Sequence, residues 1–450
     1  DCNFYARRFD SARQDYARAV EIDSSLGDYS LYQEAFVRGL QKDYNGKIQI
    51  LNRLIADYPE SQYLDDALYE QGRAFVQMED HTNAINRFNI LLKKFPESNM
   101  ARRAANEIGL LYYQGDKYPE AIQAYKQVIT NYPGSEEARL AQRDLKSIYI
   151  DLNKVDEYAN FASTIPGGAN FDVNERDSLT YVAAERVYMR GEIDEARNSF
   201  THYLQTFPEG AFSLNANYYV GLIDYNRKAY NSAAEHLDKV LAYPNNKYSE
   251  DAMMMSAEMA YSAKDYEKAL AVYKQLKDKA VSSERRQLAK TGVLRSAYMS
   301  GNGEEVILAA TDLLAETKIA PELSNEAHYY RAKAYLDAGK AEGAMEDLKI
   351  LAKDTRNVYG AEAKYKVAQI YFDAGQTGQA EKEVLNYIEV STPHTYWLAR
   401  SFVLLSDVYM KLGRNLDAKQ YLLSLRQNYQ ADDDIAGMIE SRLNKLNAEN

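Results

Sequence analysis

The sequence predicts an all-α protein built from about twelve consecutive helix pairs. Three observations lead to this prediction. A small residue recurs every 35 to 38 residues along the chain. Prolines number only 9, and several of them follow a Tyr or Phe at matching places in the period. No blocks of Val, Ile and Thr indicate strands.

The recurring residue, here called the anchor, lies in the second predicted helix of each unit. Small residues let two antiparallel helices approach closely, because bulk at the crossing would push their axes apart. Lys47, Tyr158 and Val306 are larger than the rest but keep the period. The twelve anchors are Ala12, Lys47, Ala84, Ala121, Tyr158, Ala196, Ala233, Ala269, Val306, Ala344, Ala380 and Ala418.

Other positions keep step with the anchor. A second small residue, such as Gly72 or Gly109, stands twelve residues before it, and a large one, such as Phe88, stands four residues after it and fills the space behind the crossing. Prolines at 59, 96, 133 and 208 stand twelve residues after it, where they end one helix and open the next unit. Each period therefore holds two helices.

The units differ along the chain, and we predict four segments. Residues 1–133 are N-terminal units, of which the first lacks most of its first helix; this suggests that the chain continues a longer protein. Residues 134–180 are an irregular unit with a candidate hinge at 165–170. Residues 181–429 are regular units, and 430–450 form an amphipathic capping helix.

The best units resemble the tetratricopeptide repeat family. Ala67–Gly72 and Ala216–Gly221 read Ala-x-Tyr-x-x-Gly, and Ala104–Gly109 keeps that spacing; each is followed by Tyr/His-x-x-Ala-Ile/Ala-x-x-Phe/Tyr/Leu. The resemblance covers essentially the whole chain. It implies a right-handed α-solenoid superhelix that binds a protein or peptide partner along its concave groove.

The joints between units carry a second resemblance. Tyr/Phe-Pro-Glu/Gly-Ser/Gly is similar to the joints of bacterial cell-envelope repeat proteins, such as the Tol–Pal coordinator and the repeat lipoprotein of the outer-membrane assembly machine. This likeness implies a periplasmic or outer-membrane-associated protein, with the cytoplasm as the alternative. It also allows peripheral association with the outer membrane through a preceding part of the chain.

Composition and motifs give no indication of nucleic-acid binding, metal binding or catalysis. A net charge of −12 disfavours nucleic acid as a partner. One cysteine and five scattered histidines predict no metal site, and no nucleotide, calcium or nucleophile motif is present. We therefore expect no cofactor and no enzymatic activity.

One face of the first helices is the candidate binding surface. Positions 15, 11 and 8 before each anchor share that face, here called the first-helix stripe, and the resemblance makes it concave. Aromatic rings interleaved with charged side chains on this face can bind an extended segment or a helix of a partner protein. The alternative is that the earlier tyrosines pack between neighbouring first helices. The predicted partner-binding residues are Tyr69, Arg73, Tyr113, Tyr181, Glu185, Tyr188, Tyr218, Tyr225, Glu258, Tyr261, Tyr329, Lys333, Tyr365 and Phe372.

The leading function is a non-catalytic protein-binding scaffold in envelope assembly or maintenance. One alternative is a glycan- or nutrient-binding protein, which the single tryptophan, Trp397, disfavours. A further alternative is the docking region of a larger enzyme. Self-association is a further expectation, since the first unit exposes an apolar face.

Overall fold

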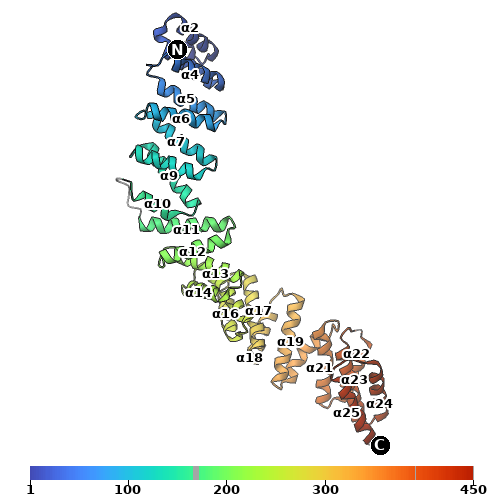
Figure 1. Cartoon of the computed structure of the whole chain (residues 1–450). Coiled ribbons are helices and arrows are strands. Elements are labelled where there is room, and N and C mark those ends of the chain that lie inside the picture. The colour runs from blue at the N-terminus through green and yellow to red at the C-terminus, as the bar shows by residue number, and fades with distance from the viewer. Residues whose placement is uncertain (166–171, 391, 449–450) are drawn as a thin grey trace. The chain divides into compact units, whose positions relative to one another are not determined.

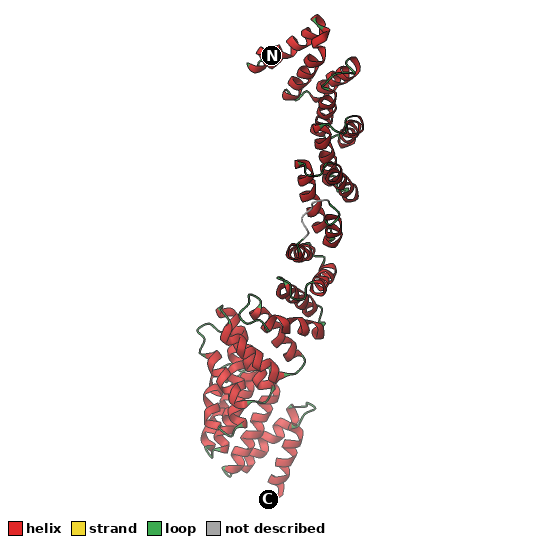
Figure 2. Ribbon diagram, turned by 90° about the vertical axis from the view of Figure 1, so that its left-hand side faces the viewer, coloured by secondary structure: helices red, strands yellow, loops and turns green. Residues whose placement is uncertain are grey.

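The computed structural model describes residues 1–165, 172–390 and 392–448, and every regular element in these ranges is a helix (Figure 2). This confirms the all-α prediction. The chain falls into two units, Asp1–Ile223 and Asp224–Asn450, and α13 (Ser213–Asn226) contains their boundary.

In the first unit, helices follow one another along the chain (Figure 1). A short 3-10 helix, Ser24–Leu26, precedes α3. The helices before α13 are α1 (Cys2–Tyr5), α2 (Phe9–Ile22), α3 (Gly27–Leu40), α4 (Tyr44–Asp57), α5 (Leu64–Gln77), α6 (His81–Lys94), α7 (Asn99–Gln114), α8 (Tyr118–Asn131), α9 (Glu136–Asp151), α10 (Val155–Ala162), α11 (Val173–Met189) and α12 (Ile193–Thr206).

The second unit continues the same alternation and ends in a single helix. Its helices after α13 are α14 (Tyr230–Leu241), α15 (Ser249–Ser262), α16 (Tyr266–Lys279), α17 (Ser283–Met299), α18 (Gly303–Leu314), α19 (Pro321–Asp337), α20 (Ala341–Leu351), α21 (Val358–Asp373), α22 (Thr377–Glu389), α23 (Thr395–Lys411), α24 (Asn415–Asn428) and α25 (Ile435–Ala448).

The predicted period is the structural period. Each of the twelve anchors lies in an even-numbered helix from α2 to α24, the second of its pair, and each is buried. The small residues twelve positions before the anchors also lie at close crossings. A Cβ added to Gly72 would stand 2.3 Å from a ring carbon of Phe88, and one added to Gly109 would stand 2.6 Å from a ring carbon of Tyr125. The anchors therefore lie at close crossings within each pair, and the buried clusters continue from one pair into the next.

The three large anchors fit for separate reasons. Lys47 is 7% exposed, its ammonium pairs with Glu70 of α5, and Gly39 leaves room beside its side chain. Tyr158 is 3% exposed and lies in α10, which has only 8 residues, whereas the other second helices have 11 to 14. Val306 is simply buried, at 2% exposure. The hinge predicted at 165–170 lies, apart from Ile165, outside the described residues.

First helices form the more closely spaced row. In the first unit α5 packs on α7, α7 on α9 and α9 on α11, and in the second unit the same holds from α15 through α25. No two second helices of neighbouring pairs pack to this extent in the described residues. First helices of neighbouring pairs therefore lie closer to one another than second helices do within each unit.

The end of the second unit agrees with the predicted cap. Ile435, Ile439, Leu443 and Leu446 of α25 are buried against α23 and α24. Asp433 accepts a hydrogen bond of 3.0 Å from the backbone N–H of Ile435, which satisfies one of the free donors at the helix start.

Every helix pair turns through one residue with positive φ. This residue stands directly before the N-cap of the second helix in all twelve units; it is glycine in five of them, such as Gly413, and a larger residue in the others, such as Lys264. Positive φ costs a residue with a Cβ about 1–2 kcal/mol. The units with larger residues therefore carry local backbone strain.

This strain gives a reciprocal stability prediction. Lys264→Gly is expected to stabilise the second unit by roughly 0.5–1 kcal/mol, because relief of the strain exceeds the entropy that glycine adds to the unfolded chain. Gly413→Ala is expected to destabilise by about 1 kcal/mol, although nothing lies within 4 Å of its added Cβ. Urea denaturation of both variants checks the opposite signs; equal signs would show that the turn conformation is not the cause.

Candidate functional site

A pocket of about 240 Å³ opens on the first-helix face of the second unit, between α15 and α17. The stripe positions of these two helices line it: Met254, Glu258 and Tyr261 from α15, and Thr291 and Arg295 from α17. Leu288, Gly292 and Tyr273 complete the lining.

Glycine shapes the floor of this pocket. A Cβ on Gly292 would stand 2.5 Å from two ring carbons of Tyr273, so only glycine lets the tyrosine ring of α16 reach under α17. Burial raises the pKa of Tyr273 to about 12. The floor is consequently an uncharged ring at neutral pH.

Polar groups at the pocket wall are held in place. The hydroxyl of Tyr225 donates a hydrogen bond to the carboxylate of Glu258. Burial and this hydrogen bond raise the pKa of Tyr225, so the phenol stays protonated and remains a donor. Arg295 donates two hydrogen bonds of 2.8 Å to Glu326 of α19, yet its side chain is 47% exposed.

The apolar part of the lining remains open to solvent. Leu288 is 55% exposed, and Tyr261 is half-buried, with its ring 5.3 Å from that of Tyr266. An exposed leucine beside a half-exposed tyrosine, with a carboxylate and a guanidinium nearby, is the composition of a contact surface.

Two predicted binding residues are covered, and this corrects the predicted surface. Tyr181 is 3% exposed; its ring stacks on Phe212 at 4.5 Å and its hydroxyl donates to Glu185 at 3.0 Å. Tyr365 is 5% exposed, and its hydroxyl accepts from Arg400 at 3.3 Å. Tyr365 packs against the next first helix, α23, whereas Tyr181 packs against α12 and the segment before α13, so a partner cannot reach either ring in this conformation.

In the first unit the other predicted residues are half-buried and engaged with neighbours. Arg73 pairs with Glu107 at 3.0 Å, and Glu185 holds Tyr181. Rings meet rings in the remaining cases: Tyr69 with Phe88 at 5.8 Å, Tyr113 with Tyr118 at 6.0 Å, Tyr188 with Tyr219 at 4.9 Å, and Tyr218 with Tyr219 at 5.6 Å.

Farther along the second unit, the stripe residues also interact with other side chains of the same chain. Tyr329 donates to Glu362 at 3.0 Å and stacks on Tyr359 at 4.5 Å, while the ammonium of Lys333 lies 5.7 Å from the centre of the Tyr329 ring. Phe372 lies 5.2 Å from the ammonium of Lys411. The predicted residues that the structure brings together at the pocket are Glu258 and Tyr261, with Tyr225 adjoining.

Sequence analysis missed Met254, Leu288, Thr291 and Arg295. Met254 stands 15 residues before anchor Ala269, and Thr291 and Arg295 stand 15 and 11 before anchor Val306. The spacing therefore identifies all three positions; Met254 and Thr291 are neither aromatic nor charged, whereas Arg295 has the same offset and charge as Arg73 and Lys333 and could have been predicted. Leu288 lies outside the three offsets, and only the structure shows that it borders the pocket.

The arrangement offers contact area and hydrogen bonds. Within the described ranges, no group of three or more His, Cys, Asp or Glu side chains is placed to hold a metal ion. Among the helices of the described part, none combines the length and apolar character needed to cross a membrane.

Comparisons with known proteins place repeats over part of the chain. A family model described as tetratricopeptide repeat matches residues 69–136 and 225–283, and another of the same description matches residues 29–61. The range 225–283 contains Tyr225, Glu258 and Tyr261. No curated protein matches the sequence.

The solved structures that are similar to the chain include three complexes or domains of other proteins. The structure of Naa15/Naa10 bound to HypK-THB is 15% identical, with a TM-score of 0.41, over 99% of this chain and 69% of that one. The TPR domain of P58(IPK) is 14% identical, with a TM-score of 0.23, over 81% of this chain and 100% of that one. The APC/C hetero-tetramer Cut9-Hcn1 is 14% identical, with a TM-score of 0.28, over 99% and 91%.

Proposed function

Because the chain is a tetratricopeptide repeat protein, we propose that it is a non-catalytic scaffold that holds a partner protein on the first-helix face of its second unit. The observation that carries this proposal is the pocket between α15 and α17, where Leu288 is 55% exposed beside Tyr261. An apolar side chain of the partner enters this pocket, over the Tyr273 ring.

The charges around the pocket would set the register of the partner. Glu258 is oriented by Tyr225, and Arg295 by Glu326, so neither side chain has to be ordered when the partner binds. Groups that are already ordered lose less entropy on association. A partner with an apolar anchor flanked by one basic and one acidic residue fits this arrangement.

Partner binding is expected to depend on Leu288. Leu288→Glu places a charge at the mouth of the pocket and should weaken capture of the partner about tenfold or more, as loss of a central contact does. The control is Leu308→Glu on α18, since Leu308 is 64% exposed and does not line the pocket.

The measurement is quantitative mass spectrometry of proteins captured from a lysate of the source cell. A defined protein retained by wild type and by Leu308→Glu, and lost with Leu288→Glu, supports the proposal. Equal retention by all three forms would place the binding surface elsewhere, and binding of a soluble glycan in calorimetry would favour the nutrient-binding alternative.

The joints between repeat units support a proposal for the cellular role of this scaffold. Tyr58-Pro59-Glu60-Ser61 and Phe95-Pro96-Glu97-Ser98 have the form found in envelope repeat proteins. In the structure Ser61 donates a hydrogen bond to Asp28 at 2.7 Å, and Ser98 donates to Asp65 at 2.5 Å. We therefore propose a role in cell-envelope assembly or maintenance. Fractionation of the source cell tests it, and recovery only with the cytoplasm would exclude that role.

A further inference from the structure

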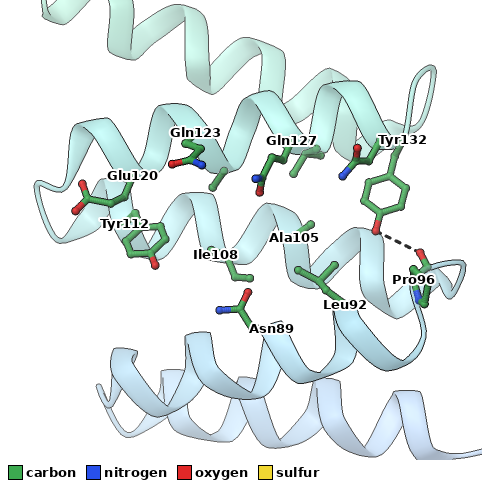
Figure 3. Close-up of a pocket in the computed structure, with 13 residues that line it drawn as sticks. Asn89, Leu92, Pro96, Ala105, Ile108, Tyr112, Glu120, Gln123, Gln127 and Tyr132 are labelled. Carbon is green, nitrogen blue, oxygen red and sulfur yellow. Dashed lines mark hydrogen bonds between the residues drawn. The ribbon is translucent and has the colours of Figure 1, made fainter.

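A second, larger groove lies in the first unit, on the side of the second helices. It has a volume of about 460 Å³ and runs between α6 and α8, with α7 beneath it. Its floor is apolar and includes Leu92, Ala105 and Ile108 (Figure 3). None of the residues that line it belongs to the predicted partner-binding set.

Primary amides line both walls of this groove. Asn89 projects from α6, and Gln123 and Gln127 project from α8 on the opposite side (Figure 3). Asn131 follows at the end of α8. All four side chains are exposed, and none is hydrogen-bonded to another group of the described chain. The amides are therefore available to a ligand as both donors and acceptors.

The two ends of the groove differ in chemistry. At one end the hydroxyl of Tyr132 donates a hydrogen bond of 3.3 Å to the carbonyl of Pro96 and bridges the walls (Figure 3). At the other end lies Glu120, near Tyr112 (Figure 3). Glu120 is the only charged residue of the lining, and it makes no ion pair with the described chain. The open end is therefore negative.

We propose that this groove binds an extended segment of another protein through its main chain, with a cationic group of that segment at Glu120. Gln123, Gln127 and Asn131 follow one another at four-residue steps along α8, which is about 6 Å per step. Main-chain groups on one side of an extended chain recur every two residues, or about 6.6 Å. The two repeats match over the length of the groove.

The same chemistry argues against a helix in the groove. A helix has its main-chain donors and acceptors paired internally, so it would cover the four amides without satisfying them. An extended segment brings unpaired N–H and C=O groups of its own. The apolar floor then accepts every second side chain, and Glu120 selects a lysine, an arginine or a free amino terminus at the open end.

The test uses the whole chain and a peptide selected on it. The probe is the peptide of about twelve residues most enriched from a displayed random library, labelled with a fluorophore. Gln123→Ala combined with Gln127→Ala should weaken its binding about tenfold or more, since two hydrogen bonds are lost. Gln420→Ala combined with Gln427→Ala, two exposed glutamines of α24, is the matched control and should change nothing.

Two further measurements separate main-chain recognition from other modes. N-methylation of alternate peptide bonds in the probe should abolish binding, and methylation of the intervening bonds should not. Glu120→Gln should weaken a probe with a cationic end several-fold, and should leave a probe with that charge removed unchanged. Leu288→Glu should not affect the probe, so failure here is distinct from failure of the second-unit scaffold.

Three results would overturn the proposal: no peptide is enriched, the double glutamine variant binds the probe as wild type does, or N-methylation shows no alternation.

Discussion

Asp347→Asn is expected to destabilise the second unit by about 3–5 kcal/mol, which is the cost of removing one partner from a buried ion pair. Asp347 of α20 is 1% exposed. Arg331 of α19 donates two hydrogen bonds to it, of 2.8 and 2.7 Å, and a ring nitrogen of His328 lies 2.7 Å from the same carboxylate. The variant would leave the guanidinium of Arg331, itself only 17% exposed, without its counter-charge.

Asp347→Asn should open α19 and α20 locally before it unfolds the rest of the chain. Each pair of a repeat array contacts only its neighbours, so opening of α19 and α20 does not require the whole chain to unfold. Hydrogen exchange of the amides of these two helices is the measurement, and protection should fall there by about a thousandfold. Asp354→Asn is the control, because its ion pair with Arg356 is exposed and should contribute nothing measurable.

The same carboxylate gives a dependence on pH. Burial pushes the pKa of Asp347 upward, but hydrogen bonds from Arg331 and His328 outweigh this and leave the pKa below its usual value of 3.8. A lowered folded pKa means that the stabilisation is complete above the unfolded value, near pH 4, and is lost as the pH falls through the folded value. Asp347→Asn should remove this acid-side loss; an unchanged acid transition would assign it to other groups.

Gly72→Ala is expected to destabilise the first unit by about 1–3 kcal/mol, because the new methyl group would stand 2.3 Å from a ring carbon of Phe88, which is fully buried. Phe88→Ala should cost about 3–5 kcal/mol through the cavity that it leaves. The chain contains its own solution to the conflict, since the corresponding pair in α3 and α4 is Ala35 with Leu51, and both are buried.

The double variant tests this pairing. Gly72→Ala combined with Phe88→Leu reproduces the Ala35–Leu51 crossing. The loss of stability in this double variant should be smaller, by about 1 kcal/mol or more, than the sum of the losses measured for Gly72→Ala alone and Phe88→Leu alone. Denaturant unfolding of the four forms measures the coupling energy. Strict additivity would mean that the two positions do not meet at the crossing.

The fold could be predicted because its determinants lie at fixed spacing in the sequence. Anchors such as Ala84, glycines such as Gly72 and the prolines at joints such as Pro59 act between helices that are consecutive in the chain. A period read from one chain is therefore sufficient to place them. Even Lys47 kept its position, although the sequence did not show that Glu70 would neutralise it.

The candidate site was less predictable because exposure depends on the neighbouring pair. Tyr181 and Tyr261 both belong to the first-helix stripe, but Phe212 covers the ring of the first, while Leu288 and the small Gly292 leave space beside the second. The charges of the stripe were expected to meet a partner, yet Arg73 meets Glu107 within the chain. These pairings join residues more than thirty positions apart, and a repeat pattern does not specify them.

The central claim is that a partner protein lies against the first-helix face at the pocket of α15 and α17. Photo-crosslinking tests it most directly, with a light-activated amino acid placed at Leu288 or, as the control, at Leu308 of α18, in the source cell. The account predicts one defined protein adduct from position 288 and none of it from position 308. The absence of an adduct at 288, or the same adducts from both positions, would contradict it.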